Sequence, residues 1–238
     1  MTDPVLIWSY LTQGPLLWLT ATLLAYWAGD RFFRAMGRQS WANPVLVAVI
    51  LLALGLGITG TSYATYFEGA QFVHFMLGPA TVALGMPLYD NLPRLRQAAL
   101  PLIAALVAGS LTAVISVLAI AKAFGLSDMM LASLAPKSTT APVAIGIAES
   151  LGGEPTITAV LVLLTGIFGA VIATPLLNLL GVRDWRARGL AVGVAAHGIG
   201  TARAFQVNDT AGAFASIGMG LNAVLTAIIA PLILHLFQ

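Results

Sequence analysis

A lysine, Lys137, stands in the middle of an apolar stretch of the chain. The stretch 130–149 reads LASLAPKSTTAPVAIGIAES. A lysine at the centre of a membrane-spanning segment costs about 2.5–3.5 kcal/mol on insertion scales, and such residues usually serve a function. We interpret Lys137 as a contact for an anion. The alternative is a structural lysine that extends to the membrane surface or pairs with Glu149 inside the protein.

The residues around Lys137 favour a helix that begins beside it. Three hydroxyl residues of the types that cap helix N-termini follow it: Ser138, Thr139 and Thr140. Pro136 and Pro142 each remove a backbone donor and so break a continuous helix, and Pro142 suits the first turn of a new one. A half-helix that starts near Thr140 directs free N–H groups and its positive dipole end toward the lysine ammonium. The pattern therefore predicts a binding place for a carboxylate.

A second unusual segment, GLAVGVAAHGIGTARAFQ at 189–206, consists largely of small residues and holds one histidine. His197 is of the residue type that titrates in the physiological range. Gly198 and Gly200 would let another backbone or a ligand come close to it. Thr201 lies four residues further on and shares the His197 face of a helix, so both side chains could contact one ligand. The alternative for His197 is a packed, hydrogen-bonded core histidine.

Two other charged residues near these segments are open to more than one interpretation. Arg203 either contacts the ligand or forms a surface pair, with Asp209 six residues away. If Lys137 and Arg203 faced one cavity, a single carboxylate would neutralise only one of the two positive charges. We therefore take Lys137 as the cation at the centre of the site. Glu149 is expected in a solvent-facing turn. It is also, after His197, a candidate for carrying a coupling proton.

The composition of the chain requires an environment other than water. Of its 238 residues, 59% are hydrophobic and only 8% are charged, against about 25% charged in soluble domains. This excludes a soluble enzyme, a nucleic-acid binder and a disordered chain. The net charge of +2 comes from few groups and implies no phosphate-binding surface. The chain has no cysteine and three scattered histidines, so we expect no disulfide, no metal site and no cofactor.

About eight apolar segments are long enough to cross a bilayer, whose ~30 Å core needs roughly 20 residues per helix. They lie near 5–28, 43–61, 71–89, 98–124, 130–149, 156–180, 189–206 and 211–237. Such long segments, without a repeated 10-residue alternation, predict an all-α integral membrane protein and not a barrel. We expect about six of them to span the membrane and two, 130–149 and 189–206, to be broken or re-entrant.

The distribution of Lys and Arg predicts the orientation of these segments. Three basic connections are expected in the cytoplasm: 29–42, 90–97 and 181–188. Plain alternation of eight spans would place 181–188 outside, so one segment between 98 and 180 should not cross. The segment 130–149 fits best, as a re-entrant hairpin that enters from outside; a broken spanning helix is the alternative. If 189–206 is also broken, two tips approach the midplane from opposite faces, as in inverted-repeat carriers.

Internal similarity supports such a repeat. LGPATVALGMP, which contains Pro79, resembles LAPKSTTAPVA, which contains Pro136, and each is followed by a long plain span. No linker or low-complexity stretch divides the chain, so we expect one transmembrane domain over 1–238. Its N-terminal helix and basic loop occupy 1–42.

Four runs of the sequence resemble the LrgB/CidB family of bacterial membrane proteins. They are PATVALGMPLY, LAPKSTTAPVAIGIAESLGG, TAVLVLLTGIFGA and RARGLAVGVAAHGIGTARAF. The likeness covers about residues 43–237, which would form the LrgB-like carrier core, and APKSTTxP with HxxGTA at this separation is specific. The family includes the plastidal glycolate/glycerate translocator of plants. Bacterial members are known as holin-like or antiholin-like proteins that affect murein hydrolase activity and autolysis, and others are linked to pyruvate transport.

The resemblance implies a secondary carrier of small monocarboxylates such as glycolate, glycerate, lactate or pyruvate. It would work in the bacterial inner membrane as a homodimer, with proton or sodium coupling and an elevator-like movement of the broken segments. Lys137 and the half-helix would bind the carboxylate. The hydroxyl groups that would bind the hydroxyl or keto oxygen are those of Ser138, Thr139, Thr140 and Thr201.

The resemblance also implies a second class of function, a holin-like pore or pore regulator that assembles with partners. This function needs no specific anion site and gives Lys137 no role. A third possibility is an accessory subunit of a small LrgA/CidA-like membrane partner.

Overall fold

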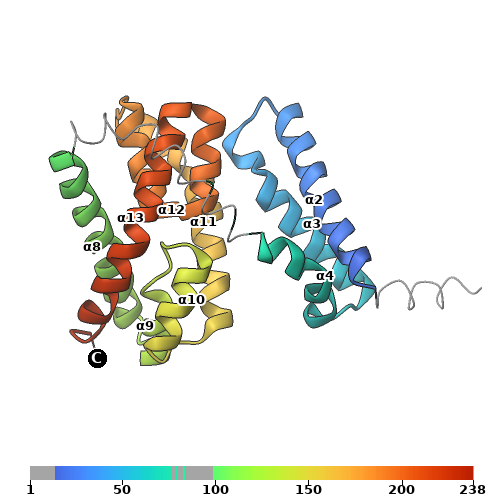
Figure 1. Ribbon diagram of the computed structural model, residues 1–238, viewed down its shortest axis with the longest axis horizontal. Coiled ribbons are helices and arrows are strands. Elements are labelled where there is room, and N and C mark those ends of the chain that lie inside the picture. Colours follow the sequence, from blue (N-terminus) through green and yellow to red (C-terminus); the bar gives the residue numbers. More distant parts are fainter. Residues whose placement is uncertain (1–13, 77–78, 80–82, 84–98, 238) are drawn as a thin grey trace, which may run out of the picture. The chain divides into compact units, whose positions relative to one another are not determined.

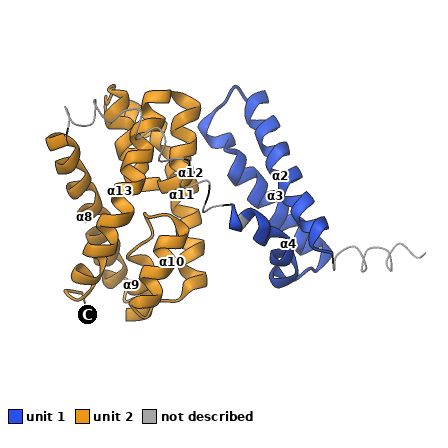
Figure 2. Ribbon diagram, viewed as in Figure 1, with its two compact units in different colours: residues 1–83 blue, residues 84–238 orange. Residues whose placement is uncertain are grey.

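The computed structural model describes residues 14–76, 79, 83 and 99–237, which contain helices and turns and no strand. The predicted all-α class is confirmed. The chain divides into two compact units, Met1–Ala83 and Leu84–Gln238 (Figure 2). The single transmembrane domain over 1–238, with a core from 43, stays a prediction.

The first unit is a small helical bundle (Figure 1). Its elements are α2 (Pro15–Ala35), the 3-10 helix η1 (Ser40–Ala42), α3 (Pro44–Thr59) and α4 (Tyr63–Phe75). Asn43 begins α3 by accepting hydrogen bonds from the backbone N–H groups of Val45 and Leu46, at 2.9 and 3.2 Å. Helix α2 packs closely on its neighbours, because the backbone of Pro44 lies against Gly29 and that of Pro15 against Gly69.

Two boundaries predicted in the first unit are wrong. Helix α2 extends to Ala35, so Arg34 lies on its last turn, where it forms an i,i+4 ion pair with Asp30 at 2.7 Å that supports the helix. The connection predicted at 62–70 is largely the start of α4, whose first turn is capped by the Ser62 hydroxyl. The segment 43–61 agrees with α3. Residues 5–13 and most of 71–98, with LGPATVALGMP and one basic loop, lie outside the described residues.

In residues 99–237, the described part of the second unit, there are three long helices and three broken or shorter ones (Figure 1). They are α8 (Ala99–Ala123), α9 (Asp128–Leu134), α10 (Ala141–Ser150), α11 (Pro155–Leu179), α12 (Trp185–Val207) and α13 (Asp209–Leu234). Within the described part of the chain, α8, α11 and α13 are long and apolar enough to cross a membrane. With about 1.5 Å per residue, each exceeds the ~30 Å of a bilayer core. These helices confirm the predicted segments 98–124, 156–180 and 211–237.

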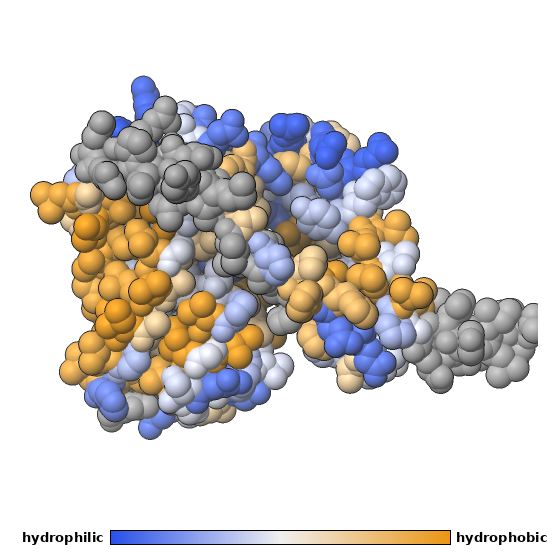
Figure 3. Space-filling model, viewed as in Figure 1, coloured by the Kyte–Doolittle hydropathy of each residue, from blue (hydrophilic) through white to orange (hydrophobic). Residues whose placement is uncertain are grey.

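The outer face of α8 is hydrophobic along its length. Leu100, Ile103, Ile120 and Phe124 are all exposed. Figure 3 shows hydrophobic side chains gathered on this side of the second unit, with hydrophilic ones toward its ends. A surface of this kind is expected where a helix faces lipid.

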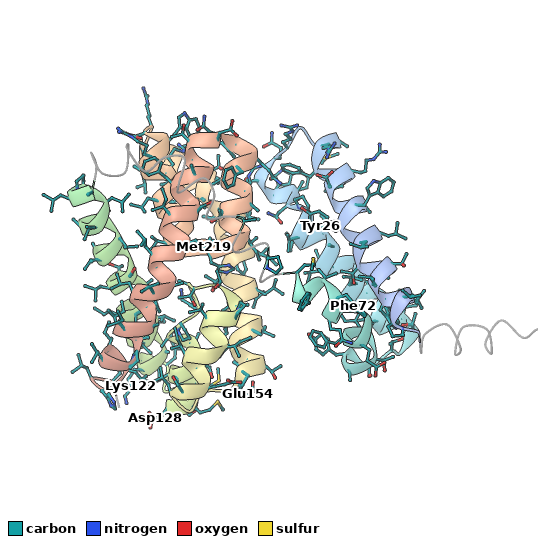
Figure 4. The ribbon with its side chains drawn as sticks, in the orientation of Figure 1. Tyr26, Phe72, Lys122, Asp128, Glu154 and Met219 are labelled. Carbon is teal, nitrogen blue, oxygen red and sulfur yellow. The ribbon has the colours of Figure 1, made fainter. Side chains whose placement is uncertain are left out.

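The segment 130–149 forms a helical hairpin, hairpin 1 (Asp128–Ser150), in which α9 and α10 are separated by a break at 135–140. The chain reverses in the break, because Glu154, just after α10, donates a backbone hydrogen bond to the Ser133 hydroxyl of α9 at 2.8 Å. Asp128 and Glu154, on either side of the hairpin, lie at the same end of the unit (Figure 4). Of the two alternatives for this segment, the hairpin agrees with the path of the chain.

Helix α12 also reverses, and forms hairpin 2 (Trp185–Val207). Ala196 (φ −128°, ψ 15°) and His197 (φ 41°, ψ −135°) leave the helical conformation. Beyond this turn, Gly200 of the second arm packs directly on Val192 of the first arm and on Ala196. The two arms, 185–195 and 198–207, therefore run antiparallel, with the tip at Ala196 and His197.

Both arms of hairpin 2 lie along α13. Gly189 and Gly193 of the first arm lie directly on the backbone of Ala211 and Ala215, so this arm runs parallel to α13. In the second arm, the ring of Phe205 packs on Gly212 near the start of α13. A side chain at either glycine of the first arm would overlap the α13 backbone, which explains why this segment consists of small residues.

Candidate functional site

The tips of the two hairpins meet at the middle of α13. Asn222, near the midpoint of that helix, donates from Nδ2 to the carbonyl oxygens of Ser138 in hairpin 1 and Val194 in hairpin 2, both at 3.2 Å. Its Oδ1 accepts hydrogen bonds from the hydroxyls of Ser110, near the midpoint of α8, and Thr226, at 2.5 and 3.3 Å. Both tips therefore lie at mid-depth between the long helices.

A cleft of about 850 Å³ lies between α8 and the first arm of hairpin 2. Lys137 and Ser138 line it at the hairpin tips, and Asp184 and Arg186 line it at the base of hairpin 2. Small and apolar residues form most of its walls, among them Leu102, Ala105, Gly109, Leu190, Ala191 and Val194. The cleft thus has one cation at its inner end and an ion pair at its outer end.

Lys137 is half-buried, and its Nζ donates a hydrogen bond to the Ser138 hydroxyl at 3.3 Å. No carboxylate of the described residues forms an ion pair with it. Glu149 lies exposed in the last turn of α10, and the internal pair with Lys137 is not formed. The positive charge of Lys137 therefore faces the cleft without a neutralising acid from the described part of the chain.

Helix α10 begins at Ala141, with Thr140 as its N-cap residue, which agrees with the helix start expected there. Pro136 lies in the break and Pro142 in the first turn of the new helix. The Thr140 side chain makes no capping hydrogen bond, and the buried Thr139 hydroxyl donates to the Pro136 carbonyl at 3.1 Å. Close to Lys137, the break thus contains a helix N-terminus whose N–H groups are not capped by Thr140.

His197 is buried at the tip of hairpin 2 and faces α11. Its Nε2 lies 2.9 Å from the carbonyl oxygen of Val162, and its own carbonyl accepts a hydrogen bond from the Thr201 hydroxyl at 2.7 Å. A Cβ at Gly198 would make only an ordinary contact, with the Met219 sulfur at 3.9 Å. His197 is not among the described residues that line the cleft, but Lys137 is close enough to interact with it electrostatically.

Arg203 lies on another side of hairpin 2 from Lys137. It is buried, and with Arg188 and Thr174 it lines a small pocket of about 20 Å³ between α11 and α12. Arg188 donates to the Asn178 side chain and to the Val182 carbonyl, each at 2.8 Å. The structure therefore does not bring Arg203 into the cleft, and its contact with a ligand stays a prediction.

The outer end of the cleft carries the ion pair of Asp184 and Arg186, whose closest N–O distance is 2.6 Å. Asp184 is also the N-cap of α12, because it accepts a hydrogen bond from the backbone N–H of Arg186 at 2.8 Å. The hydrogen bonds from the Arg186 side chain and backbone lower the pKa of Asp184 to about 2.

Residues 22–236, which include both hairpins and the cleft, match the LrgB-like family. The chain belongs to the LrgB-like family. The resemblance expected from its motifs is thereby confirmed. The match includes Lys137, the hairpin tips and Asn222, so the site is part of the LrgB-like region and not of an added segment.

Several bacterial proteins are similar to this LrgB-like chain over most of their length. The uncharacterized protein YwbG of Bacillus subtilis is 35% identical over 91% of this chain and 96% of its own. YxaC of the same organism is 37% identical over 82% and 85%. The holin-like protein CidB of Staphylococcus aureus is 32% identical over 93% and 96%. No solved structure matches the chain. The staphylococcal relatives are named holin-like proteins, and the LrgB-like family is not an enzyme family.

Two glycines of α11 that sequence reasoning missed make room for the tip of hairpin 2 in this LrgB-like fold. Gly166 lies against the imidazole of His197, and Gly169 lies against Ala196. The segment 156–180 reads as a plain apolar span, but its G-x-x-G spacing puts both glycines on one helix face. That spacing was the available signal for a close approach.

Proposed function

We propose that this LrgB-like protein is a secondary carrier of small monocarboxylates in the bacterial inner membrane. One observation carries the proposal: Lys137 is held at the inner end of a cleft without an ion-pair partner among the described residues. An ionisable residue at this depth is costly and is kept where it binds a substrate or an ion. The cleft reaches Lys137 from the base of hairpin 2, which provides a path for that substrate.

The chemistry of the cleft supports a monoanion with a short apolar part. A single cation matches one carboxylate, whose oxygens would also meet the N-terminus of α10. The Ser138 hydroxyl lines the same end and would bind a hydroxyl or keto oxygen in the 2-position. Thr139 and Thr201 donate to backbone carbonyls and would contact substrate only after a rotamer change. Glycolate, glycerate, lactate and pyruvate meet these requirements.

The paths of the hairpins support an inverted arrangement in the membrane. The basic connection 181–188 at the base of hairpin 2 would be cytoplasmic, and hairpin 1 would enter from outside. About six spanning helices would then surround two re-entrant tips. Access would alternate by an elevator-like movement of the hairpins with the helices they pack on, in a homodimer. His197, beside Lys137, is better placed than the exposed Glu149 to carry a coupling proton.

The alternative is a holin-like pore, or a regulator of one, that controls murein hydrolase activity together with a small LrgA/CidA-like partner. The names of the staphylococcal relatives favour it. This function does not use the cleft or Lys137.

Uptake by purified protein in liposomes tests the proposal. We expect saturable uptake of labelled pyruvate or glycolate that Lys137→Ala abolishes. Lys122→Ala is the matched control, because Lys122 is exposed at the end of α8, where it donates to the Phe237 carbonyl; this variant should transport normally. Leakage of unrelated small dyes, with equal rates in both variants, would instead support the pore.

A further inference from the structure

Asn222 is a buried side chain whose hydrogen-bonding capacity is fully used. It is 1% exposed, both of its N–H donors are engaged, and its oxygen accepts two hydroxyl hydrogen bonds. A side-chain amide has two donors and two acceptor positions. Three of its four partners, on α8 and on the two hairpins, lie outside its own helix.

The two carbonyl groups that accept hydrogen bonds from Asn222 have no helical N–H partner four residues further along the chain. The residue four positions after Ser138 is Pro142, which has no N–H. The residue four positions after Val194 is Gly198, which lies beyond the reversal at His197. Each carbonyl therefore lacks its helical hydrogen bond because of a helix break. The Asn222 side chain donates a hydrogen bond to both carbonyls.

We propose that Asn222 is a positioning residue that couples the tips of the two hairpins, so that neither tip moves without the other. The inference rests on the proposed function, because it describes how the same site opens and closes. Ser138 and Val194 both line the cleft, Ser138 beside Lys137 and Val194 on the wall formed by the first arm of hairpin 2. Asn222 thus sets the distance between the cation and the wall against which a substrate lies.

The physical reason for coupling is the cost of a half-bonded amide. If hairpin 1 moved alone, one Asn222 donor would lose its partner in a buried environment. An unpaired buried polar group lowers the population of such a state by about tenfold or more. A joint movement avoids the intermediate with one bond made and one bond broken.

Cysteine accessibility tests this coupling without a transport assay. The chain contains no cysteine, so Thr139→Cys and Val194→Cys, introduced one at a time, report on the two tips. Both native side chains are buried, at 0% and 5% exposure. The rate of alkylation by N-ethylmaleimide is measured in liposomes, with native Asn222 and with Asn222→Asp or Asn222→Ala. Asn222→Asp preserves shape and the bonds from Ser110 and Thr226 but places a carboxylate oxygen against the two carbonyls.

Ser110→Ala is the matched control, because it removes a buried hydrogen bond to Asn222 and leaves both tip contacts in place. We expect both Asn222 variants to raise alkylation at both tips about tenfold or more, as for the loss of two net hydrogen bonds. Ser110→Ala should change neither rate more than about threefold. Size-exclusion profiles of all variants check that the fold is retained.

Acceleration at one tip only, or equal acceleration by Ser110→Ala, would overturn the coupling. If the alkylation rate rises at both tips but the protein transports no carboxylate, the coupling proposal is supported and the carrier proposal is contradicted. In an active carrier, saturating pyruvate should slow alkylation at both tips, and Asn222→Asp should abolish this protection at Val194→Cys. Protection that survives at Val194→Cys would contradict the proposal.

Discussion

The Nε2 atom of His197 lies 2.9 Å from the carbonyl oxygen of Val162, which ties the tip of hairpin 2 to α11. His197 makes this contact with a φ of 41°, a region that favours glycine. A non-glycine residue there costs on the order of 1–3 kcal/mol. A glycine would remove the strain but also the imidazole. The contact of the imidazole with Val162 therefore explains why this turn has a histidine.

Gly166→Ala should destabilise the protein. The new Cβ would lie 2.6 Å from Cε1 of the His197 ring, and overpacking of this kind costs about 1–3 kcal/mol. Thermal unfolding of the detergent-purified protein measures the change. Gly146→Ala is the control, since Gly146 lies in α10 with open space around it; it should be neutral or stabilising by about 0.5–1 kcal/mol. A Gly166→Ala melting temperature at or above that of the native protein would contradict the contact.

His197→Gln should remove the dependence of uptake on a proton gradient. Glutamine can still donate a hydrogen bond to Val162 but does not titrate. Liposomes loaded at one pH and diluted into a more acidic buffer measure pyruvate uptake with an inward gradient. We expect the native protein to respond and the variant not to respond. A response that persists in the variant would assign the coupling proton to another group, with Glu149 next to be tested.

Ala191→Leu should weaken substrate uptake without destabilising the fold. Ala191 is exposed and lines the cleft between its outer and inner ends, so a larger side chain narrows the path to Lys137. We expect a rise in KM or a loss of kcat of about tenfold, as for a contact worth ~1.4 kcal/mol. Ala202→Leu is the control, because Ala202 is exposed on the other arm and is not among the described cleft residues. Equal uptake by both variants would place the substrate path elsewhere.

Arg186→Ala should shift the acid sensitivity of the start of α12. The native pKa of Asp184 is about 2, below the ~3.9 of an unfolded aspartate. A lowered pKa stabilises the folded state above the unfolded value, and this contribution is lost as the pH falls through about 2. Without Arg186, the pKa of Asp184 should move back toward the unfolded value, so the variant should melt at a lower temperature near neutral pH but lose less stability on acidification, and the two curves should converge near pH 2. Arg183→Ala, which does not touch the pair, should follow the native curve.

The long helices could be predicted from the sequence because length and apolarity alone define them. Segments 98–124, 156–180 and 211–237 differ from α8, α11 and α13 by a few residues at each end. The break in hairpin 1 was equally accessible, since proline forbids a continuous helix for purely local reasons.

The reversal in hairpin 2 was harder to predict, because it occurs at a histidine and depends on the space that Gly166 and Gly169 leave on another helix. The same limit applies to the cations. Lys137 and Arg203 occur in similar small-residue segments, and only the packing of the hairpin arms decides which of them faces the cleft. Asn222 accepts a hydrogen bond from Ser110 of another helix, but its two carbonyl partners are brought to it only by the tertiary structure.

The direct contact of Gly189 and Gly193 with the backbone of α13 determines how much of the protein must move together with the tip of hairpin 2. Because the two backbones are in direct contact at these glycines, the first arm of hairpin 2 cannot rotate or shift along α13 without steric clashes. A swing of the tip must therefore carry the N-terminal half of α13 along with it. Whatever opens this site is a block of several helical stretches and not a thin flap, and its hinges belong outside the block.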